Sequence, residues 1–327
     1  MDSGNHQPFY QVLERSLCQL GNTKAANQFL HFYIFLYMRP TLCDTFRSLS
    51  FLTWDMLAKG RSVDCQIGEE TLTDINILEL KIRHSSEIYT RTFSTTQEGS
   101  EGADWEWWFT GSSKKWIGFR VQAKVIDFET NSFEHLHYQN KNNPLSQCQI
   151  LIQRAVESSS RLIPLYCLYS NWNNSPQFTS RYANYYPVQE SYGCSILSAF
   201  AVRYLQSKKR KPANFKVLRP YMTPWDGLVC CYGDRASDLP HKVLENWKKF
   251  IRPIEIDILD GLDETIYHEL DGKLKHYRRI YDDIQLIDNP PEHVQLLLKN
   301  ELVDQPDPNL RSLTVFQERD EPIEIDW

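Results

Sequence analysis

The most constraining feature of this chain is a pair of alternating segments on either side of one polar turn. Residues 104–109 and 117–125 alternate between apolar and polar side chains, and residues 111–115 between them read Gly-Ser-Ser-Lys-Lys. Alternation of this length predicts β-strands, and the short polar link predicts an antiparallel hairpin. With the turn centred on Ser113, one face of the hairpin is wholly apolar, and a shift of one residue would scatter the polar groups over both faces.

The polar face of this hairpin carries a set of groups with a recognisable chemistry. The predicted register places Asp104 opposite Gln122, and Lys124 lies two residues farther along on the same face. Directly opposed residues have Cβ atoms about 5 Å apart, so two such side chains can share one ion. A carboxylate, an amide oxygen and an ammonium are the groups needed to hold Mg²⁺ and to position an attacking water.

Two other pairs on this face have ordinary structural interpretations. Glu106 lies opposite Arg120 and is expected to form a cross-strand ion pair. Trp108 lies over Gly118. Its ring is either part of the core or a surface that contacts the substrate.

The order of the predicted elements defines the fold class. Apolar residues recur at helical spacing between residues 43 and 60 and again from residue 72, after Glu69 and Glu70. A strand over 88–93, the hairpin, a helix starting near Ser146 and a buried strand over 163–169 follow, then a helix over 193–205, a short strand over 228–231 and a helix over 241–251. This order predicts an α/β fold with a mixed sheet flanked by helices.

The chain is expected to have three parts. Residues 1–38 form an N-terminal extension, residues 39–252 the α/β domain, and residues 253–327 an acidic extension with helices over 263–280 and 291–302 and a polar tail. The acidity of the last part suggests a further hypothesis, in which it covers a basic groove and restrains activity. The simpler alternative is a solvated extension.

Composition limits the classes of function. The net charge of −6 argues against a protein that only binds nucleic acid, although it allows a nuclease with a local basic groove. The eight cysteines include no CxxC pair, which predicts reduced thiols in a cytoplasmic protein. The most apolar stretch, residues 29–38, is about half the length of a membrane span, so no membrane association is expected.

The ordered residues resemble a known superfamily. Glu69 and Glu70 on a helix, then Asp104, then Gln122-Ala123-Lys124 on the next strand, are similar to the PD-(D/E)xK nuclease core in its QxK, Mrr-like variant. The blocks Gly-Ala-Asp-Trp-Glu-Trp-Trp-Phe (102–109) and Val-Gln-Ala-Lys (121–124) also resemble an uncharacterised prokaryotic family associated with defence. The resemblance covers roughly residues 39–170, and more weakly residues 190–231, and it implies a restriction-endonuclease-like core.

The resemblance also implies roles for individual residues. Asp104, the Gln122 amide oxygen and the Ala123 backbone carbonyl would ligate Mg²⁺ or Mn²⁺, and Lys124 would orient the attacking water. Glu70, or its neighbour Glu69, would complete the metal shell from the helix. The residues expected to contact the substrate are Gln147, Trp108, Lys208, Lys209, Arg210 and Lys211. The neutral Gln122 weakens the site for the ion, so a substrate phosphate is expected to complete the shell.

Each of these groups also has a purely structural alternative. Glu69 and Glu70 lie at the start of a predicted helix, where acidic side chains interact favourably with the helix dipole whether or not they bind a metal ion. Gln147 can be read as an exposed polar helix residue, and the basic run 208–211 as a solvated helix end. The residues on strand 121–125 that alternate with Gln122 and Lys124 are small and apolar, which predicts a central strand. A central strand must either bury or use its polar side chains.

Two functional hypotheses follow from these observations. The first is a Mg²⁺-dependent endonuclease, with DNA as the expected substrate, acting as an anti-phage effector alone, as a homo-oligomer or with a defence-system partner protein. The second is a catalytically inactive module that binds nucleic acid or protein on the same fold. Without a Gly-rich phosphate loop or a Gly-x-Ser-x-Gly elbow in the sequence, nucleotide hydrolysis and serine hydrolysis have no support.

Overall fold

The computed structural model describes residues 40–93, 105–139, 141, 144–158, 160, 162–172, 188–208, 212–230, 237–254, 284–307 and 310–318. The chain divides into two units, Met1–Thr41 and Leu42–Trp327, and every element below belongs to the second unit. The expected N-terminal extension over 1–38 and the expected helix over 263–280 lie outside the described residues.

A seven-stranded mixed sheet forms the centre of the second unit, with the strand order β1-β7-β2-β3-β4-β5-β6. The strands β2 and β3 form the predicted hairpin in the predicted register, with Trp107 paired with Phe119 and Trp108 with Gly118. The strands β3 and β4 are parallel, and β7 runs parallel to β2 and antiparallel to β1. The strand bounds are β1 Ile88–Thr92, β2 Trp105–Thr110, β3 Trp116–Val125, β4 Ile163–Tyr169, β5 Cys194–Ser198, β6 Thr223–Pro224 and β7 Ser312–Gln317.

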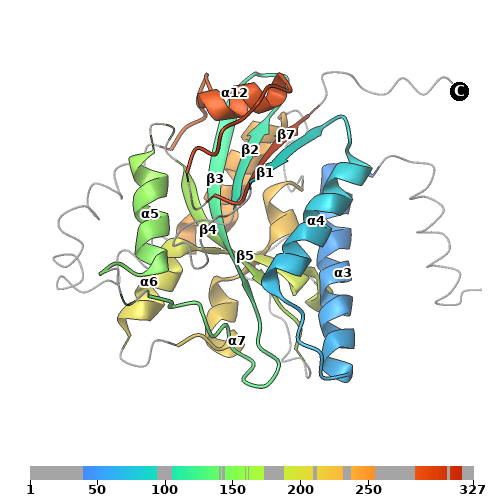
Figure 1. The fold of residues 1–327 in the computed structure, drawn as a ribbon, viewed down its shortest axis with the longest axis vertical. Coiled ribbons are helices and arrows are strands. Elements are labelled where there is room, and N and C mark those ends of the chain that lie inside the picture. Colours follow the sequence, from blue (N-terminus) through green and yellow to red (C-terminus); the bar gives the residue numbers. More distant parts are fainter. Residues whose placement is uncertain are drawn as a thin grey trace, which may run out of the picture. The chain divides into compact units, whose positions relative to one another are not determined.

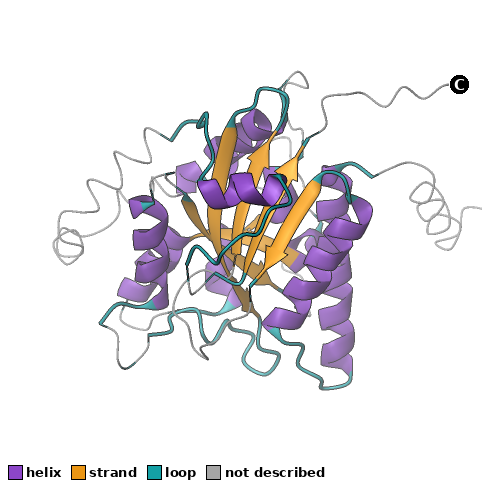
Figure 2. Cartoon of the chain, turned by 45° about the horizontal axis from the view of Figure 1, so that its top comes forward, coloured by secondary structure: helices purple, strands orange, loops and turns teal. Residues whose placement is uncertain are grey.

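Helices cover both faces of this sheet, so the α/β fold class with a mixed sheet flanked by helices is confirmed. Figure 1 shows α3 and α4 on one side of the sheet and α5 and α6 on the other. Figure 2 shows α12 lying across the strands, and α12 packs on β1 and β7. The helix bounds are α3 Leu42–Ser62, α4 Glu69–Arg83, α5 Gln147–Glu157, α6 Ala199–Ser207, α7 Phe215–Leu218, α8 Leu239–Phe250 and α12 Glu292–Leu298, and the 3₁₀ turns are η1 Gln189–Gly193, η2 Arg219–Tyr221 and η3 Trp225–Leu228.

Local sequence signals explain where several helices begin. The Ser146 side chain accepts a hydrogen bond from the Gln149 N–H, and the Gln149 side chain accepts one from the Ser146 N–H, so a full capping box starts α5. The first turn of α4 contains Glu69 and Glu70, and its last turn contains Lys81 and Arg83. This distribution of charge complements the helix dipole.

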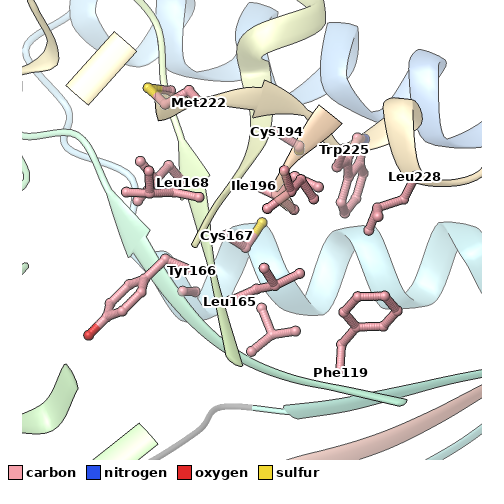
Figure 3. Close-up of a cluster of buried hydrophobic side chains, with 14 of the residues drawn as sticks. Phe119, Leu165, Tyr166, Cys167, Leu168, Cys194, Ile196, Met222, Trp225 and Leu228 are labelled. Carbon is pink, nitrogen blue, oxygen red and sulfur yellow. The ribbon is translucent and has the colours of Figure 1, made fainter. Parts of the chain in front are cut away.

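The apolar face predicted for the hairpin lies in the main core. Trp107 contacts Phe46 of α3, Trp225 of η3 and Phe316 of β7, with ring centroids 6.0–6.1 Å apart. Farther along the sheet, Figure 3 shows the alternation of β4, with Tyr166 and Leu168 on one side of the strand and Leu165 and Cys167 on the other. All four are fully buried, which is expected of a parallel strand covered on both faces.

Two local predictions were wrong. The helix expected over 193–205 is a strand, β5, followed by the shorter helix α6. Most residues of this segment are apolar, so its period does not distinguish a helix from a strand. The Ser198 side chain caps a helix that begins only at Ala199. The strand expected over 228–231 is replaced by η3 and a turn, in which the Cys230 N–H donates to the Asp226 carbonyl at 2.9 Å.

The expected C-terminal extension contributes a strand to the interior of the sheet. The strand β7 lies between β1 and β2, and Val315 and Phe316 at its centre are buried. The boundary expected at residue 253 therefore does not separate this region from the α/β domain. The expected helix over 291–302 is present as the shorter α12.

The cysteines also differ from expectation, because Cys43 and Cys230 form a disulfide. It joins the start of α3 to the turn after η3, across 187 residues of sequence. The described cysteines Cys65, Cys148, Cys167 and Cys194 are not disulfide-bonded. Among the described helices, none is long and apolar enough to cross a bilayer.

Candidate functional site

The topology brings several element ends to one edge of the sheet. The strands β1, β3 and β4 end at this edge, while β2 and β7 begin there, because Trp105 pairs with both Val121 and Ser312. The helix α4 begins at the same edge, where its first residues share a pocket with Trp105 and Ser312. The helix α5 also begins there, since its last turn meets the start of β4 through the Leu162 N–H and the Ala155 carbonyl, 3.0 Å apart.

Lys124 of β3 meets Glu69 of α4 at this edge. The Lys124 Nζ lies 3.5 Å from the Glu69 Oε2, and the two side chains are 8% and 25% exposed. Gln122, on the same strand face by alternation, is buried, as is Ala123 between them. The structure therefore brings two of the predicted groups together, the Lys124 ammonium and the carboxylate of Glu69, and it buries Gln122 and Ala123 on the same strand.

The two acids at the start of α4, Glu69 and Glu70, form ion pairs with different residues. Glu70 does not pair with Lys124; its Oε1 lies 2.5 Å from Nη1 of Arg311, the residue before β7. Successive helix residues point about 100° apart, so neighbouring acids at a helix start face different surroundings. Of the two alternatives, Glu69 is the acid beside Lys124 and Glu70 the acid beside Arg311, and which of them would ligate a metal ion stays a prediction.

An open pocket lies beside the two helix acids, Glu69 and Glu70. Its wall is formed by the first turns of α4, the end of β1 and the first residues of β2 and β7. The lining residues are Glu69, Glu70, Thr73, Asp74, Ile77, Thr92, Phe93, Trp105, Arg311 and Ser312. Asp104 lies outside the described residues, but it directly precedes Trp105 in the sequence.

A hydroxyl pair holds the first turn of α4 in position. The Tyr169 hydroxyl lies 3.0 Å from the Thr73 Oγ1, and the Thr73 hydroxyl donates to the Glu69 carbonyl at 2.9 Å. Burial raises the pKa of Tyr169 well above its ordinary value, so its hydroxyl stays protonated near neutral pH. Tyr169 therefore fixes the backbone that carries Glu69 and does not supply a base.

The remaining predicted substrate contacts have mixed outcomes. Trp108 is fully buried beneath α12 and its indole N–H donates to Glu106 at 3.2 Å, so its predicted contact with substrate is wrong and the core interpretation is confirmed. Gln147 is the first residue of α5 and is only 9% exposed. The structure gives it no contact with Lys124, and its role in substrate binding stays a prediction.

Only one residue of the basic run lies in the described part of the chain. Lys208 follows α6, and its Nζ lies 4.1 Å from the centroid of the Tyr204 ring. The Ser146 hydroxyl donates to Gln206 at 3.0 Å, which brings the end of α6 to the start of α5. Lys209, Arg210 and Lys211 lie outside the described residues.

The predicted Glu106–Arg120 pair is present within a larger buried network. The Arg120 Nη1 lies 3.6 Å from the Glu106 Oε1, and its Nη2 pairs with Asp307. Asp307 also accepts from Arg154 at 3.0 Å, and the His293 Nε2 lies 3.0 Å from the Glu106 Oε2. The C-terminal region thus supplies both His293 and Asp307, and the network joins that region to the hairpin.

The donor set at the edge can be compared with the needs of a metal ion. Among the residues that the structure describes, no group of three His, Cys, Asp or Glu side chains forms a metal site. The nearby donors are oxygens: the Glu69 carboxylate, the Gln122 amide and the Ala123 carbonyl. Oxygen ligands of this kind are those that Mg²⁺ and Mn²⁺ prefer.

Thiol chemistry has no support in the interior of this domain. Burial raises the pKa of Cys148 and of Cys194 to about 12 in each case. A cysteine acts as a nucleophile through its thiolate, which these two residues do not form near neutral pH.

A comparison of the sequence with protein families gives one match over most of the chain. The profile of a family of unknown function, DUF6615, matches residues 42–322. The chain belongs to this family. The matched range begins with α3 and extends past β7, so the family includes the strand that completes the sheet. No curated protein and no solved structure matches the chain.

Sequence reasoning missed Arg311 and Tyr169 as residues of this edge. Both have partners on α4, which lies far from them in the sequence. One local signal existed for Arg311. The run Leu313-Thr314-Val315-Phe316 has a high β-propensity and is separated from Arg311 by Ser312 alone, so it marks Arg311 as a residue just before a strand. Tyr169 ends a strand that was correctly predicted, and its polar tip at that end is the only local indication.

Proposed function

We propose that this protein is a Mg²⁺-dependent nuclease that hydrolyses phosphodiester bonds, with DNA as its substrate. The observation that carries the proposal is the approach of the Lys124 ammonium to the Glu69 carboxylate, 3.5 Å apart, at the edge where β2 begins. In the sequence, Asp104 directly precedes Trp105, which is the first residue of β2 and lines the pocket.

The residues divide the chemistry between them. Lys124 positions the attacking water and offsets the negative charge of the scissile phosphate, because an ammonium held in a largely buried site acts more strongly than one in bulk water. Asp104, Glu69, the Gln122 amide oxygen and the Ala123 carbonyl would hold the metal ion. When bound, the ion would lower the pKa of a water and polarise the phosphate.

The charge balance of the pocket supports a cation. Three carboxylates line it, from Glu69, Glu70 and Asp74, while Lys124 and Arg311 contribute two positive charges through their ion pairs. The remaining negative charge, to which Asp104 would add, favours a divalent ion. A defence role, alone or with a partner protein, is part of the same proposal and rests on the resemblance of the Asp104 and Gln122-Ala123-Lys124 blocks.

Cleavage of plasmid DNA with Mg²⁺, Mn²⁺ or EDTA tests the proposal. Wild type should cut only with the metal, and Asp104→Asn, Lys124→Met and Glu69→Gln should each lose about 100-fold or more of the rate. The matched control is Lys115→Ala, which removes an exposed lysine that pairs with Asp288 at the opposite end of β3.

Two results would overturn the nuclease proposal. One is a purified, folded wild type that cuts no DNA or RNA, single- or double-stranded, with either metal. The other is a cleavage rate that does not change in Lys124→Met. DNA binding that persists without any cleavage would favour the alternative, a catalytically inactive nucleic-acid-binding module on this fold.

A further inference from the structure

We propose that Arg311 binds a phosphodiester group of the substrate, and that Glu70 holds the Arg311 guanidinium while no substrate is present. This inference rests on the proposed nuclease function, whose site it extends. It assigns a substrate-binding residue to the C-terminal strand.

The backbone of Arg311 is fixed at the edge of the pocket. The Arg311 carbonyl accepts a hydrogen bond from the Phe93 N–H at 2.7 Å, which ties it to the end of β1. The next residue, Ser312, pairs with Trp105 in the parallel β7–β2 ladder. Arg311 therefore directly precedes the residue of β7 that lies beside Trp105, the first residue of β2.

The side chain of Arg311 lines the pocket and stays accessible. It shares the pocket wall with Glu70 and Thr92, and it is 34% exposed, whereas Glu70 is 69% exposed. An ion pair with so exposed a carboxylate contributes little free energy, because water screens both charges. A ligand with a stronger preference for the guanidinium can therefore displace Glu70.

A phosphodiester is the ligand that this arrangement favours. The planar guanidinium donates two parallel N–H groups, which match two phosphate oxygens. Exchange of Glu70 for a phosphate leaves the Arg311 charge neutralised and releases one carboxylate into the pocket. That carboxylate then adds to the negative charge that attracts the divalent ion, so substrate and metal support each other's binding.

Binding of a short fluorescein-labelled DNA duplex in EDTA tests this inference without any cleavage. The full chain is compared with Arg311→Gln, Arg311→Lys and Glu70→Gln over a range of salt concentrations. Arg311→Gln should weaken binding about tenfold and reduce the slope of log affinity against log salt by about one. Arg311→Lys should have a salt slope between those of Arg311→Gln and wild type, because lysine keeps the positive charge but lacks the planar, bidentate guanidinium.

The Glu70→Gln variant distinguishes a Glu70 that competes with phosphate from a Glu70 that only stabilises the fold. If Glu70 competes with phosphate for Arg311, removal of its charge should tighten DNA binding up to about fivefold. The control is Arg83→Gln, which breaks an arginine–carboxylate pair with Glu79 at the other end of α4. Its binding curve should match that of wild type.

The outcomes separate this inference from the nuclease proposal. Unchanged binding and slope in Arg311→Gln, or weaker binding in Glu70→Gln, would overturn the role of Arg311 even if Lys124→Met abolishes cleavage. Conversely, Arg311-dependent binding by a wild type that never cuts DNA would support Arg311 and overturn hydrolysis. No binding of the duplex by wild type would overturn the inference as well.

Discussion

The ion pair between Glu69 and Lys124 makes a prediction that is independent of any enzymatic assay. The perturbation is a double-mutant cycle with Glu69→Gln, Lys124→Met and both together. Each change is close to its original residue in size, so the cycle mainly removes charge. The measured quantity is the free energy of unfolding of each variant, from which the coupling between the two side chains follows.

The magnitude follows from the distance and the exposure of the two groups. At 3.5 Å an effective dielectric constant of 20 gives a gross attraction of about 5 kcal/mol. Water reaches the quarter-exposed Glu69 and screens the pair, so the coupling should be about 1–3 kcal/mol. Lys124 is the more buried partner, and Glu69→Gln leaves its ammonium without this counterion. Glu69→Gln should therefore destabilise the protein more than Lys124→Met does.

Urea unfolding at low and high salt measures both the coupling and the order of the single variants. High salt should change the coupling only slightly, because a largely buried ammonium is poorly screened. A coupling below about 0.3 kcal/mol would mean that the two groups do not meet, and the reverse order of the single variants would contradict their burial. The double variant should be more stable than Glu69→Gln, because it no longer buries an unpaired ammonium, but it should not regain cleavage. This result would separate the structural contribution of the pair from its proposed chemistry.

Three further predictions concern the scaffold. Gly118→Ala should cost about 1–3 kcal/mol in urea unfolding, because the new Cβ would lie 2.5 Å from Leu162 and 2.8 Å from Trp108; an unchanged stability would contradict this packing. Cys43→Ser should lower the unfolding free energy by about 2–5 kcal/mol under non-reducing conditions, and thiol titration that finds Cys43 fully reactive in the unreduced protein would refute the disulfide. Deletion of residues 253–327 should abolish cooperative unfolding because it removes β7, so a truncated chain that folds would show that β7 is dispensable.

The parts of the fold that were predictable are those with local signals. The hairpin register follows from alternation on both sides of one turn, and this alternation alone specifies the pairing of Trp107 with Phe119. The strand Ile163–Tyr169 and the helix Glu69–Arg83 are also marked by their own apolar patterns. In each case the residue pattern that predicts the structure lies within one or two neighbouring elements, so contacts between distant segments are not needed for the prediction.

The parts that were missed depend on pairing between distant segments. The strand β7 is six residues long and follows an acidic region, so nothing local distinguishes a central strand from a β-prone piece of a tail. Its partners β1 and β2 lie far earlier in the sequence, and only the closed sheet defines its place. The Cys43–Cys230 disulfide and the Glu70–Arg311 pair were missed for the same reason.

The two polar clusters on one face of the hairpin differ in a way that bears on function. Glu106 and Arg120 are sealed beneath the C-terminal region, where Asp307, Arg154 and His293 complete their charge balance. Such a network stabilises one arrangement and has no access for a ligand. Lys124, at the end of the same strand face, instead pairs with Glu69, which lines an open pocket with surplus negative charge. Burial of the Lys124 ammonium costs free energy, as burial of Arg120 does, and the substitutions at Lys124 test whether its position beside an accessible carboxylate serves catalysis.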